Sequence, residues 1–131
     1  MRLLDTDTCI WLLRGDARVI EHRARILDEV ATTWITASEL FYGAARSRHP
    51  DDSAASVLEL LTTMPVLELD AVSARIFGEA KALLERRGER LDDSDLLIGA
   101  IAATHGAVLV TGNVRHFSRI PGVTLENWLR P

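Results

Sequence analysis

Acidic side chains and one asparagine recur where apolar segments of this chain end or begin. They are Asp5, Glu39, Asp92, Asp93, Asp95 and Asn113. Hard oxygen ligands that converge on one crevice can bind Mg²⁺ or Mn²⁺. Such ions can activate a water molecule and stabilise the leaving oxygen of a phosphodiester. This chemistry requires a fold that brings the six residues together.

Each of these residues also has a purely structural interpretation. The segment "TASE", which ends at Glu39, matches a capping box in which Glu39 closes back on the Thr36 amide. Asp5, Asp92 and Asp93 are typical helix N-caps or first-turn acids. Capping is the more common role for any one of them. Their shared place at one edge of the predicted sheet favours a site.

The elements that would position these residues alternate between strands and helices. Strands are predicted over 2–5, 33–36, 66–69, 107–113 and 123–129, and helices over 8–15, 16–30, 37–48, 53–64, 70–88 and 95–106. This alternation predicts a mostly parallel sheet covered by helices on both faces. Sites in such folds form beyond the carboxyl ends of the strands.

The composition fits one globular domain and argues against several classes of protein. The 131 residues carry a formal net charge of −4, unlike proteins that bind nucleic acid by bulk positive charge. A bound divalent cation would reverse the sign of an acidic pocket. The single cysteine suits a reducing compartment, and the longest apolar run, 96–103, is too short to cross a bilayer. We expect one domain over 1–131, cytoplasmic and without a membrane anchor.

Three segments together resemble the PIN-domain ribonucleases of the VapC toxin type. They are "LLDTDTCIWLL", "TASELFYGA", and the stretch from Asp93 to Trp128 that begins "DSDLLIGAIAATHGAVLVTGN". Their order and spacing together are specific. The resemblance implies a three-layer α/β/α sandwich with a mostly parallel central sheet. It also implies an endoribonuclease that depends on Mg²⁺ or Mn²⁺ and hydrolyses structured RNA with a metal-activated water.

The resemblance assigns roles to particular residues. Asp5 matches the acid of the family's first-strand motif and would bind metal, as would Asp95, which stands three residues before Ile98. Glu39 matches the glutamate of the second motif and would help order metal and water. Asn113 stands where many relatives carry a fourth acid, so the number of metal ions, one or two, stays open.

Supporting roles follow from the same resemblance. Thr111 matches a hydroxyl beside the site and Asp93 a candidate outer-shell acid, whereas Asp7 stands where relatives often have asparagine and is expected to be dispensable. Candidates for contacts with RNA phosphates are the arginines that flank the motifs: Arg14, Arg46, Arg115 and Arg119. The resemblance also implies a cognate antitoxin protein that blocks the acidic pocket. The assembly would be a homodimer or a toxin–antitoxin hetero-oligomer.

Two other functions fit part of the pattern. "LLDTDTC" matches the strand-Asp-x-Asp spacing of haloacid-dehalogenase-type phosphotransferases, with Asp5 as nucleophile and Asp7 as acid/base. That interpretation leaves Glu39 and Asn113 without a role, and Cys9 stands where that family has threonine or valine. In a non-catalytic interaction domain, the acids would only cap helices. The two enzymes differ in whether Asp7 or Glu39 is essential.

Overall fold

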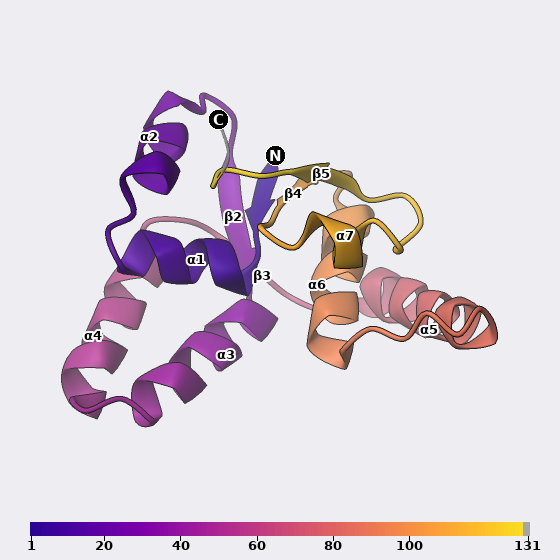
Figure 1. The fold of residues 1–131 in the computed structure, drawn as a ribbon, viewed down its shortest axis with the longest axis horizontal. Coiled ribbons are helices and arrows are strands. Elements are labelled where there is room, and N and C mark those ends of the chain that lie inside the picture. Colours follow the sequence, from indigo (N-terminus) through magenta and orange to yellow (C-terminus); the bar gives the residue numbers. More distant parts are fainter. Residues whose placement is uncertain (130–131) are drawn as a thin grey trace.

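The computed structural model describes residues 1–129 and places a five-stranded sheet at the centre of the molecule (Figure 1). The strands are β1 (Arg2–Leu4), β2 (Val30–Thr33), β3 (Val66–Leu67), β4 (Val108–Val110) and β5 (Thr124–Glu126). All neighbouring strands are parallel, in the order β3-β2-β1-β4-β5. The predicted parallel sheet is confirmed. The chain winds outward in opposite directions from the β1–β4 pair, which makes this pair the switch point of the topology.

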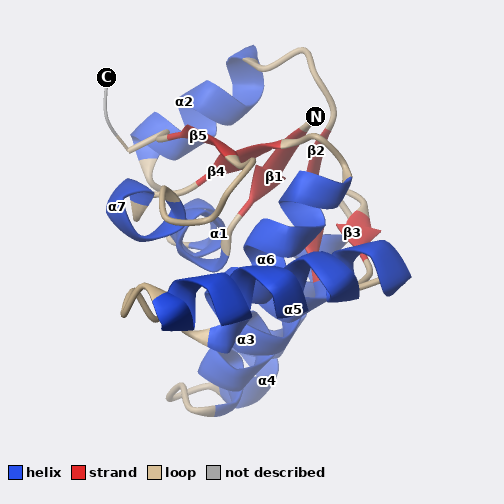
Figure 2. Cartoon of the chain, turned by 90° about the vertical axis from the view of Figure 1, so that its right-hand side faces the viewer, coloured by secondary structure: helices blue, strands red, loops and turns tan. Residues whose placement is uncertain are grey.

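Helices cover both faces of the sheet. They are α1 (Thr6–Leu13), α2 (Ala17–Arg25), α3 (Trp34–Ala45), α4 (Pro50–Leu61), α5 (Ala71–Arg86), α6 (Asp93–Thr104) and α7 (Val114–Phe117). Leu4 belongs to a buried cluster with side chains of α1 to α4, whereas its neighbour Leu3 belongs to a second cluster with α5, α6 and α7. Figure 2 shows α5 and α6 on the side that faces the viewer. The three-layer sandwich is therefore confirmed.

The second strand lies earlier in the chain than predicted. β2 ends at Thr33, and the residues expected in a strand over 33–36 instead begin α3. The hydroxyl of Thr33 caps this helix by accepting a hydrogen bond from the Thr36 amide at 3.1 Å. The predicted capping box is wrong, because Thr36 already lies inside the helix. Glu39 consequently lies one turn further along α3, and its carboxylate is not used as a cap.

Other boundaries shift by a few residues. α1 begins at Thr6 with Asp5 as its N-cap, and α4 begins at Pro50, earlier than predicted. The cap predicted at Asp16 is confirmed, since its side chain accepts hydrogen bonds from two amides of α2. The short helix α7 was not predicted. The predicted domain extends to Pro131, and residues 130–131 lie outside the described part of the chain.

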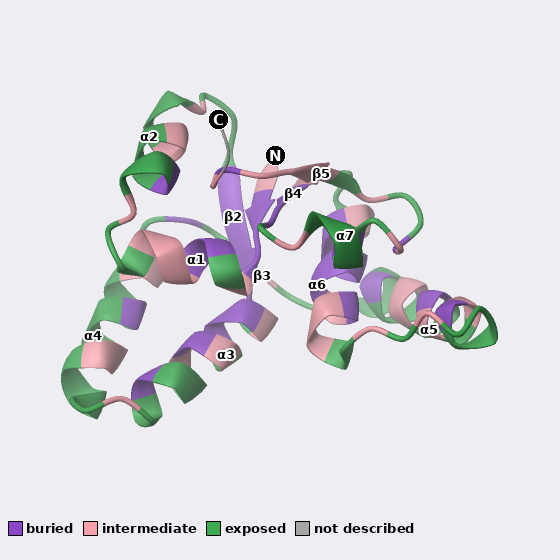
Figure 3. Ribbon diagram, in the orientation of Figure 1, coloured by how far each residue is buried: buried purple, intermediate pink, exposed green. Residues whose placement is uncertain are grey.

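Helix α6 is largely enclosed, with only Asp93 exposed, as the apolar sequence that follows its first turn predicts. Six of its 12 residues are buried, and Figure 3 shows α6 as one of the most enclosed helices. Gly99 permits this packing, because a Cβ at this position would lie 2.5 Å from the Ile120 side chain. Within residues 1–129, neither α6 nor any other helix has the length and apolar character needed to cross a membrane.

Candidate active site

The predicted site residues come from elements that end or begin at the carboxyl edge of the sheet. Asp5 directly follows β1, and Thr111 directly follows β4. These two strands form the switch point, where ligand sites of open α/β sheets lie. The Asp5 amide donates a hydrogen bond to the Val110 carbonyl at 3.1 Å, which fixes the two strand ends to each other. α3 carries Glu39 and α6 carries Asp95 toward the same edge.

Asp5 is a buried carboxylate with few partners. It is only 3% exposed, and its Oδ1 accepts a hydrogen bond from the Thr8 amide at 2.8 Å. Burial raises the pKa of Asp5 to about 6, although contacts with Thr111 and Thr8 act in the opposite direction. The cap and the metal-ligand interpretations of Asp5 are compatible, since the cap uses one carboxylate oxygen.

Thr111 and Asn113 are connected through the turn that follows β4. The Thr111 hydroxyl oxygen accepts a hydrogen bond from the backbone N–H of Asn113 at 2.8 Å. The hydroxyl proton remains available to the Asp5 carboxylate. The side-chain nitrogen of Asn113 lies 2.9 Å from His116 Nδ1. Because an amide nitrogen only donates, His116 Nδ1 is the acceptor and the Asn113 carbonyl oxygen is not used in this bond.

Asp95 lies where the negative charges of several elements meet. Burial raises the pKa of Asp95 to about 6, with further contributions from the charges of Glu39, Asp92, Asp5 and Asp7, in that order. These acids come from α1, α3, the end of β1 and the start of α6. The structure therefore brings Asp5, Glu39 and Asp95 within electrostatic range of one another.

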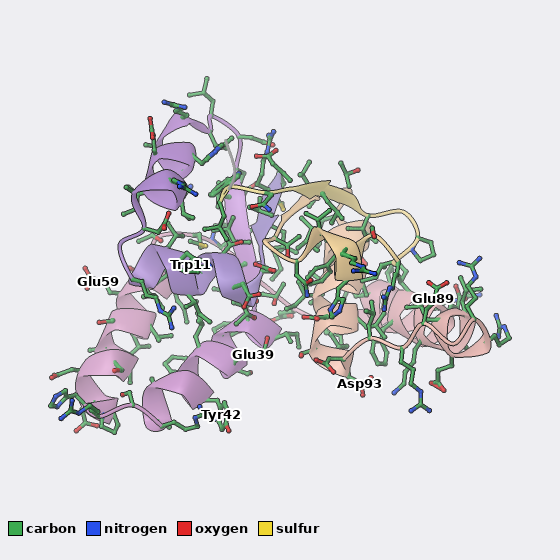
Figure 4. The ribbon with its side chains drawn as sticks, viewed as in Figure 1. Trp11, Glu39, Tyr42, Glu59, Glu89 and Asp93 are labelled. Carbon is green, nitrogen blue, oxygen red and sulfur yellow. The ribbon has the colours of Figure 1, made fainter. Side chains whose placement is uncertain are left out.

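Thr6, the first residue of α1, connects Glu39 to that helix. The Thr6 hydroxyl lies 2.5 Å from Glu39 Oε1 and 3.2 Å from the Thr36 hydroxyl (Figure 4 labels Glu39). The sequence interpretation gave Thr6 no role, although it follows Asp5 directly. A threonine in the first turn of a helix is too common for its type alone to indicate such a contact.

The two acids that precede Asp95, Asp92 and Asp93, interact with different groups. The Asp93 carboxylate pairs with Lys81 of α5 at 2.9 Å, at the start of α6 (Figure 4). Asp92 adds its charge to the field at Asp95. The outer-shell role expected for Asp93 would therefore have to coexist with an ion pair to α5. Asp92, already one of the candidate acids in the sequence, is thus a further acid whose charge acts near Asp95.

The four arginines expected to contact RNA phosphates fall into two pairs. One pair follows α1 and α3, and the other lies on α7 and just after it. Arg14, after α1, lines a groove of about 390 Å³ together with Glu39. Arg46, after α3, packs over the Tyr42 ring at 5.0 Å and donates to its hydroxyl at 3.0 Å. Arg115 is exposed on α7, and Arg119 follows that helix. A phosphate role for these arginines stays a prediction.

The donor set fits a divalent cation in chemistry. Carboxylate oxygens are the ligands that hard cations prefer, and a cation would relieve the repulsion among Asp5, Glu39 and Asp95. Across residues 1–129, no three His, Cys, Asp or Glu side chains are already close enough to coordinate one ion. A cation at this edge would therefore have to draw the carboxylates closer together.

Comparison with known proteins identifies the family. The PIN domain model matches residues 2–123, which include every predicted site residue. The chain belongs to the PIN-domain family. Nucleases of this family depend on metal ions, in agreement with the acidic edge described above.

Known relatives of this PIN domain span nearly its whole length. A tRNA(fMet)-specific endonuclease VapC of Salmonella typhimurium is 35% identical over 127 residues, 96% of each chain. A ribonuclease VapC2 of Haemophilus influenzae is 30% identical over 128 residues, 97% of each chain. The predicted resemblance to VapC-type ribonucleases is confirmed, and the class is endoribonuclease.

Solved structures share the fold of this PIN domain and are protein complexes. DNA-bound VapBC of Salmonella typhimurium has a TM-score of 0.92 at 34% identity, covering 97% of each chain. VapBC2 of Rickettsia felis, bound to a DNA fragment from its promoter, has a TM-score of 0.92 at 27% identity and covers 97% of this chain and 98% of its own. The phosphotransferase and interaction-domain alternatives are not favoured by these relatives.

Proposed function

We propose that this PIN domain is the toxin ribonuclease of a toxin–antitoxin pair and cleaves structured RNA at the site formed by Asp5, Glu39 and Asp95. The observation that carries this proposal is the convergence of these acids, from three separate elements, at the carboxyl edge of the sheet. A protein that used them only as caps would have no reason to bring them together, since capping is satisfied within each helix.

Each residue has a distinct role in the proposed reaction. Asp5 and Asp95 would hold the cation with their carboxylates, and Thr111 would support Asp5 with its hydroxyl. Glu39 orients the water that attacks the scissile phosphate, and Thr6 fixes the Glu39 carboxylate by its hydrogen bond at 2.5 Å. Hydrolysis by a metal-activated water uses neither a protein nucleophile nor an aspartate acid/base beside it, so Asp7 is not essential. Asn113 offers its carbonyl oxygen as a neutral ligand or as an acceptor for water.

The cation that suits this donor set is Mg²⁺ or Mn²⁺. Both prefer oxygen ligands, and the site offers carboxylates without histidine or cysteine among its proposed ligands. When bound, the ion supplies Lewis-acid chemistry for water and for the leaving oxygen at the phosphate. The acidic net charge of the chain is thereby compatible with an RNA substrate.

We further propose that a cognate antitoxin holds this chain inactive. Related VapC chains occur in solved VapBC complexes, and a separate VapBC complex is described as a member of a family of toxin–antitoxin systems. RNA and a co-produced antitoxin would both meet this chain in the cytoplasm, where we place its activity. A homodimer within such a hetero-oligomer stays a prediction.

RNA cleavage by purified variants tests the proposed site. With Mg²⁺ or Mn²⁺ present, wild type should cut structured RNA, and Asp5→Asn, Glu39→Gln and Asp95→Asn should each lower the rate at least a hundredfold, since each removes a ligand or the group that orients water. Cleavage is measured on labelled RNA, and circular dichroism checks that each variant is folded.

The matched control for this experiment is Asp7→Asn. Asp7 contributes charge to the same region but is exposed, and its removal should change the cleavage rate by less than about tenfold, the effect of a surface charge. Loss of activity in Asp7→Asn with full activity in Glu39→Gln would instead identify the phosphotransferase.

A further inference from the structure

A second concave region adjoins the proposed active site and has no role in the reaction described above. This pocket, of about 480 Å³, lies between α5, the start of α6 and α7. Its volume falls within the usual range for small-molecule sites, roughly 300–1,000 Å³. Leu84, Leu91 and Leu96 form its apolar part.

Two of the lining residues connect this pocket to the catalytic edge. Asp92 forms part of its wall, and the charge of Asp92 acts on Asp95. His116 also lines it and accepts a hydrogen bond from Asn113 at 2.9 Å. Through Asp92 and His116, a group bound in the pocket would consequently be connected to the edge that carries Asp95 and Asn113.

The polar groups of the pocket include both donors and acceptors. Arg90 lines it and takes part in no ion pair within the described range 1–129. Because His116 Nδ1 accepts from Asn113, its Nε2 carries the proton and is a donor. Glu85 supplies an acceptor. Lys81 is already paired with Asp93 at 2.9 Å, which reduces its attraction for a phosphate.

This mixture fits a nucleobase better than a phosphate. A phosphate site needs an excess of positive charge, whereas the formal charges around the pocket are two positive (Lys81, Arg90) against three negative (Glu85, Asp92, Asp93). A base offers an apolar face, together with donors and acceptors along its edge. Proteins that read single-stranded RNA stack such faces on arginine or histidine planes and bond the edges.

We propose that the pocket lined by Arg90, His116 and Leu91 binds one unpaired base next to the scissile bond and sets the base preference of cleavage. This proposal rests on the proposed ribonuclease function. It predicts that the preference resides in α5, α7 and the segment that precedes α6, separate from the carboxylates that perform the hydrolysis.

A cleavage profile tests this proposal directly. Wild type, Arg90→Ala, His116→Ala and the double variant are incubated with Mn²⁺ and a pool of RNA hairpins whose loops are randomised, and the products are sequenced. We expect a preferred base at one position beside the cut in wild type, and a preference weakened about tenfold in the double variant, as loss of stacking on one base gives. Arg86→Ala, an exposed arginine of α5 outside the pocket, is the matched control and should keep the wild-type profile.

A second measurement separates base binding from a structural effect. An abasic nucleotide is placed at the preferred position of one cleaved hairpin, and KM is compared with that of the intact hairpin. Wild type should show a KM about tenfold higher on the abasic substrate than on the intact hairpin. The double variant should show the same KM on both, because removing the base and removing the Arg90 and His116 side chains eliminate the same contact.

Other results would overturn the proposal in recognisable ways. An unchanged profile in the double variant excludes base recognition by the pocket. A uniform loss on all hairpins with an unchanged profile indicates a phosphate contact instead of base recognition. A wild type that cuts no RNA overturns the ribonuclease function as well, which distinguishes that failure from the others.

Discussion

The carboxylate of Asp5 serves two purposes that are often treated as alternatives. It caps α1 through the Thr8 amide, and it faces the acids of the proposed site from a position that is 3% exposed. The cap fixes the direction of the side chain, while burial raises its pKa to about 6. A carboxylate held in this way gains most from a cation, because the cation compensates the cost of keeping the charge out of water.

The stability of the metal-free protein should depend on pH through Asp5. Its folded pKa of about 6 lies above the ordinary value of 3.8, so the stabilisation is complete below about pH 4 and is lost as pH rises through about 6. Asp5→Asn keeps the cap and removes the buried charge. In EDTA at pH 8, the variant should be more stable by about 3 kcal/mol, from roughly 1.4 kcal/mol for each of two pKa units. Urea unfolding at pH 4 and pH 8 measures this.

The comparison of two pH values supplies the internal control. The advantage of Asp5→Asn should shrink toward pH 4, where the wild-type carboxyl group is protonated. If the free energies of unfolding of wild type and Asp5→Asn differed equally at pH 4 and pH 8, the charge of Asp5 would not destabilise the folded protein.

Thr6 should matter for catalysis more than for folding. Removal of its hydroxyl in Thr6→Val leaves the Glu39 carboxylate without its partner at 2.5 Å, and kcat should fall about tenfold or more, as for a lost hydrogen bond to a charged group. Thr6→Ser should retain most of kcat. Steady-state kinetics on one RNA substrate separates kcat from KM. Loss of kcat in Thr6→Ser with full kcat in Thr6→Val would show that the methyl group, not the hydroxyl, is needed.

At the scale of elements, the start of α3 determines where Glu39 lies. β2 pairs with β1 over its first two residues and with β3 over Thr32 and Thr33, so the strand ends at Thr33 and the helix begins at the next residue. Glu39 then lies in the second turn of α3, on the side that meets Thr6 of α1. A helix that began at the predicted place, three residues later, would have used this carboxylate to cap itself.

The Thr33 cap should therefore contribute measurable stability. Thr33→Ala removes the acceptor for the Thr36 amide and should lower the free energy of unfolding by about 1 kcal/mol more than Thr33→Ser, which keeps the hydroxyl. Both variants lose the same methyl group, so their difference isolates the cap. Urea denaturation measures it, and equal losses would show that another group accepts from Thr36.

At the scale of the whole molecule, the topology concentrates acids on a chain that is already negative. Strand order reverses at the β1–β4 pair, and the residues that follow these strands meet the first turns of α1 and α6. A net charge of −4 provides little attraction for RNA away from the site. Binding of substrate should therefore depend strongly on the cation.

The growth of cells that produce this chain tests the proposed toxin function. Production of the wild-type chain without an antitoxin should slow growth, because a free ribonuclease depletes its RNA target. Production of Asp5→Asn to the same level should not. Culture density and immunoblots measure both quantities, and equal growth of the two cultures would contradict the toxin function.

The sequence by itself determined the class of the fold and the residue types of the site. Alternating apolar strands and amphipathic helices dictate a covered parallel sheet, because each apolar face must be buried. The motifs around Asp5, Glu39 and Asp95 were sufficient to indicate a nuclease family, since their order along the chain is specific.

Only the tertiary structure decided how these residues are used. The run from Val30 to Thr36 is rich in β-branched residues throughout, and only its pairing with β1 and β3 decides where the strand stops. The contact of Thr6 with Glu39, the ion pair of Asp93 with Lys81, and the pocket beside Asp92 join positions far apart in the chain. Local sequence sets preferences for each segment, whereas contacts of this kind depend on packing between segments, which no local pattern encodes.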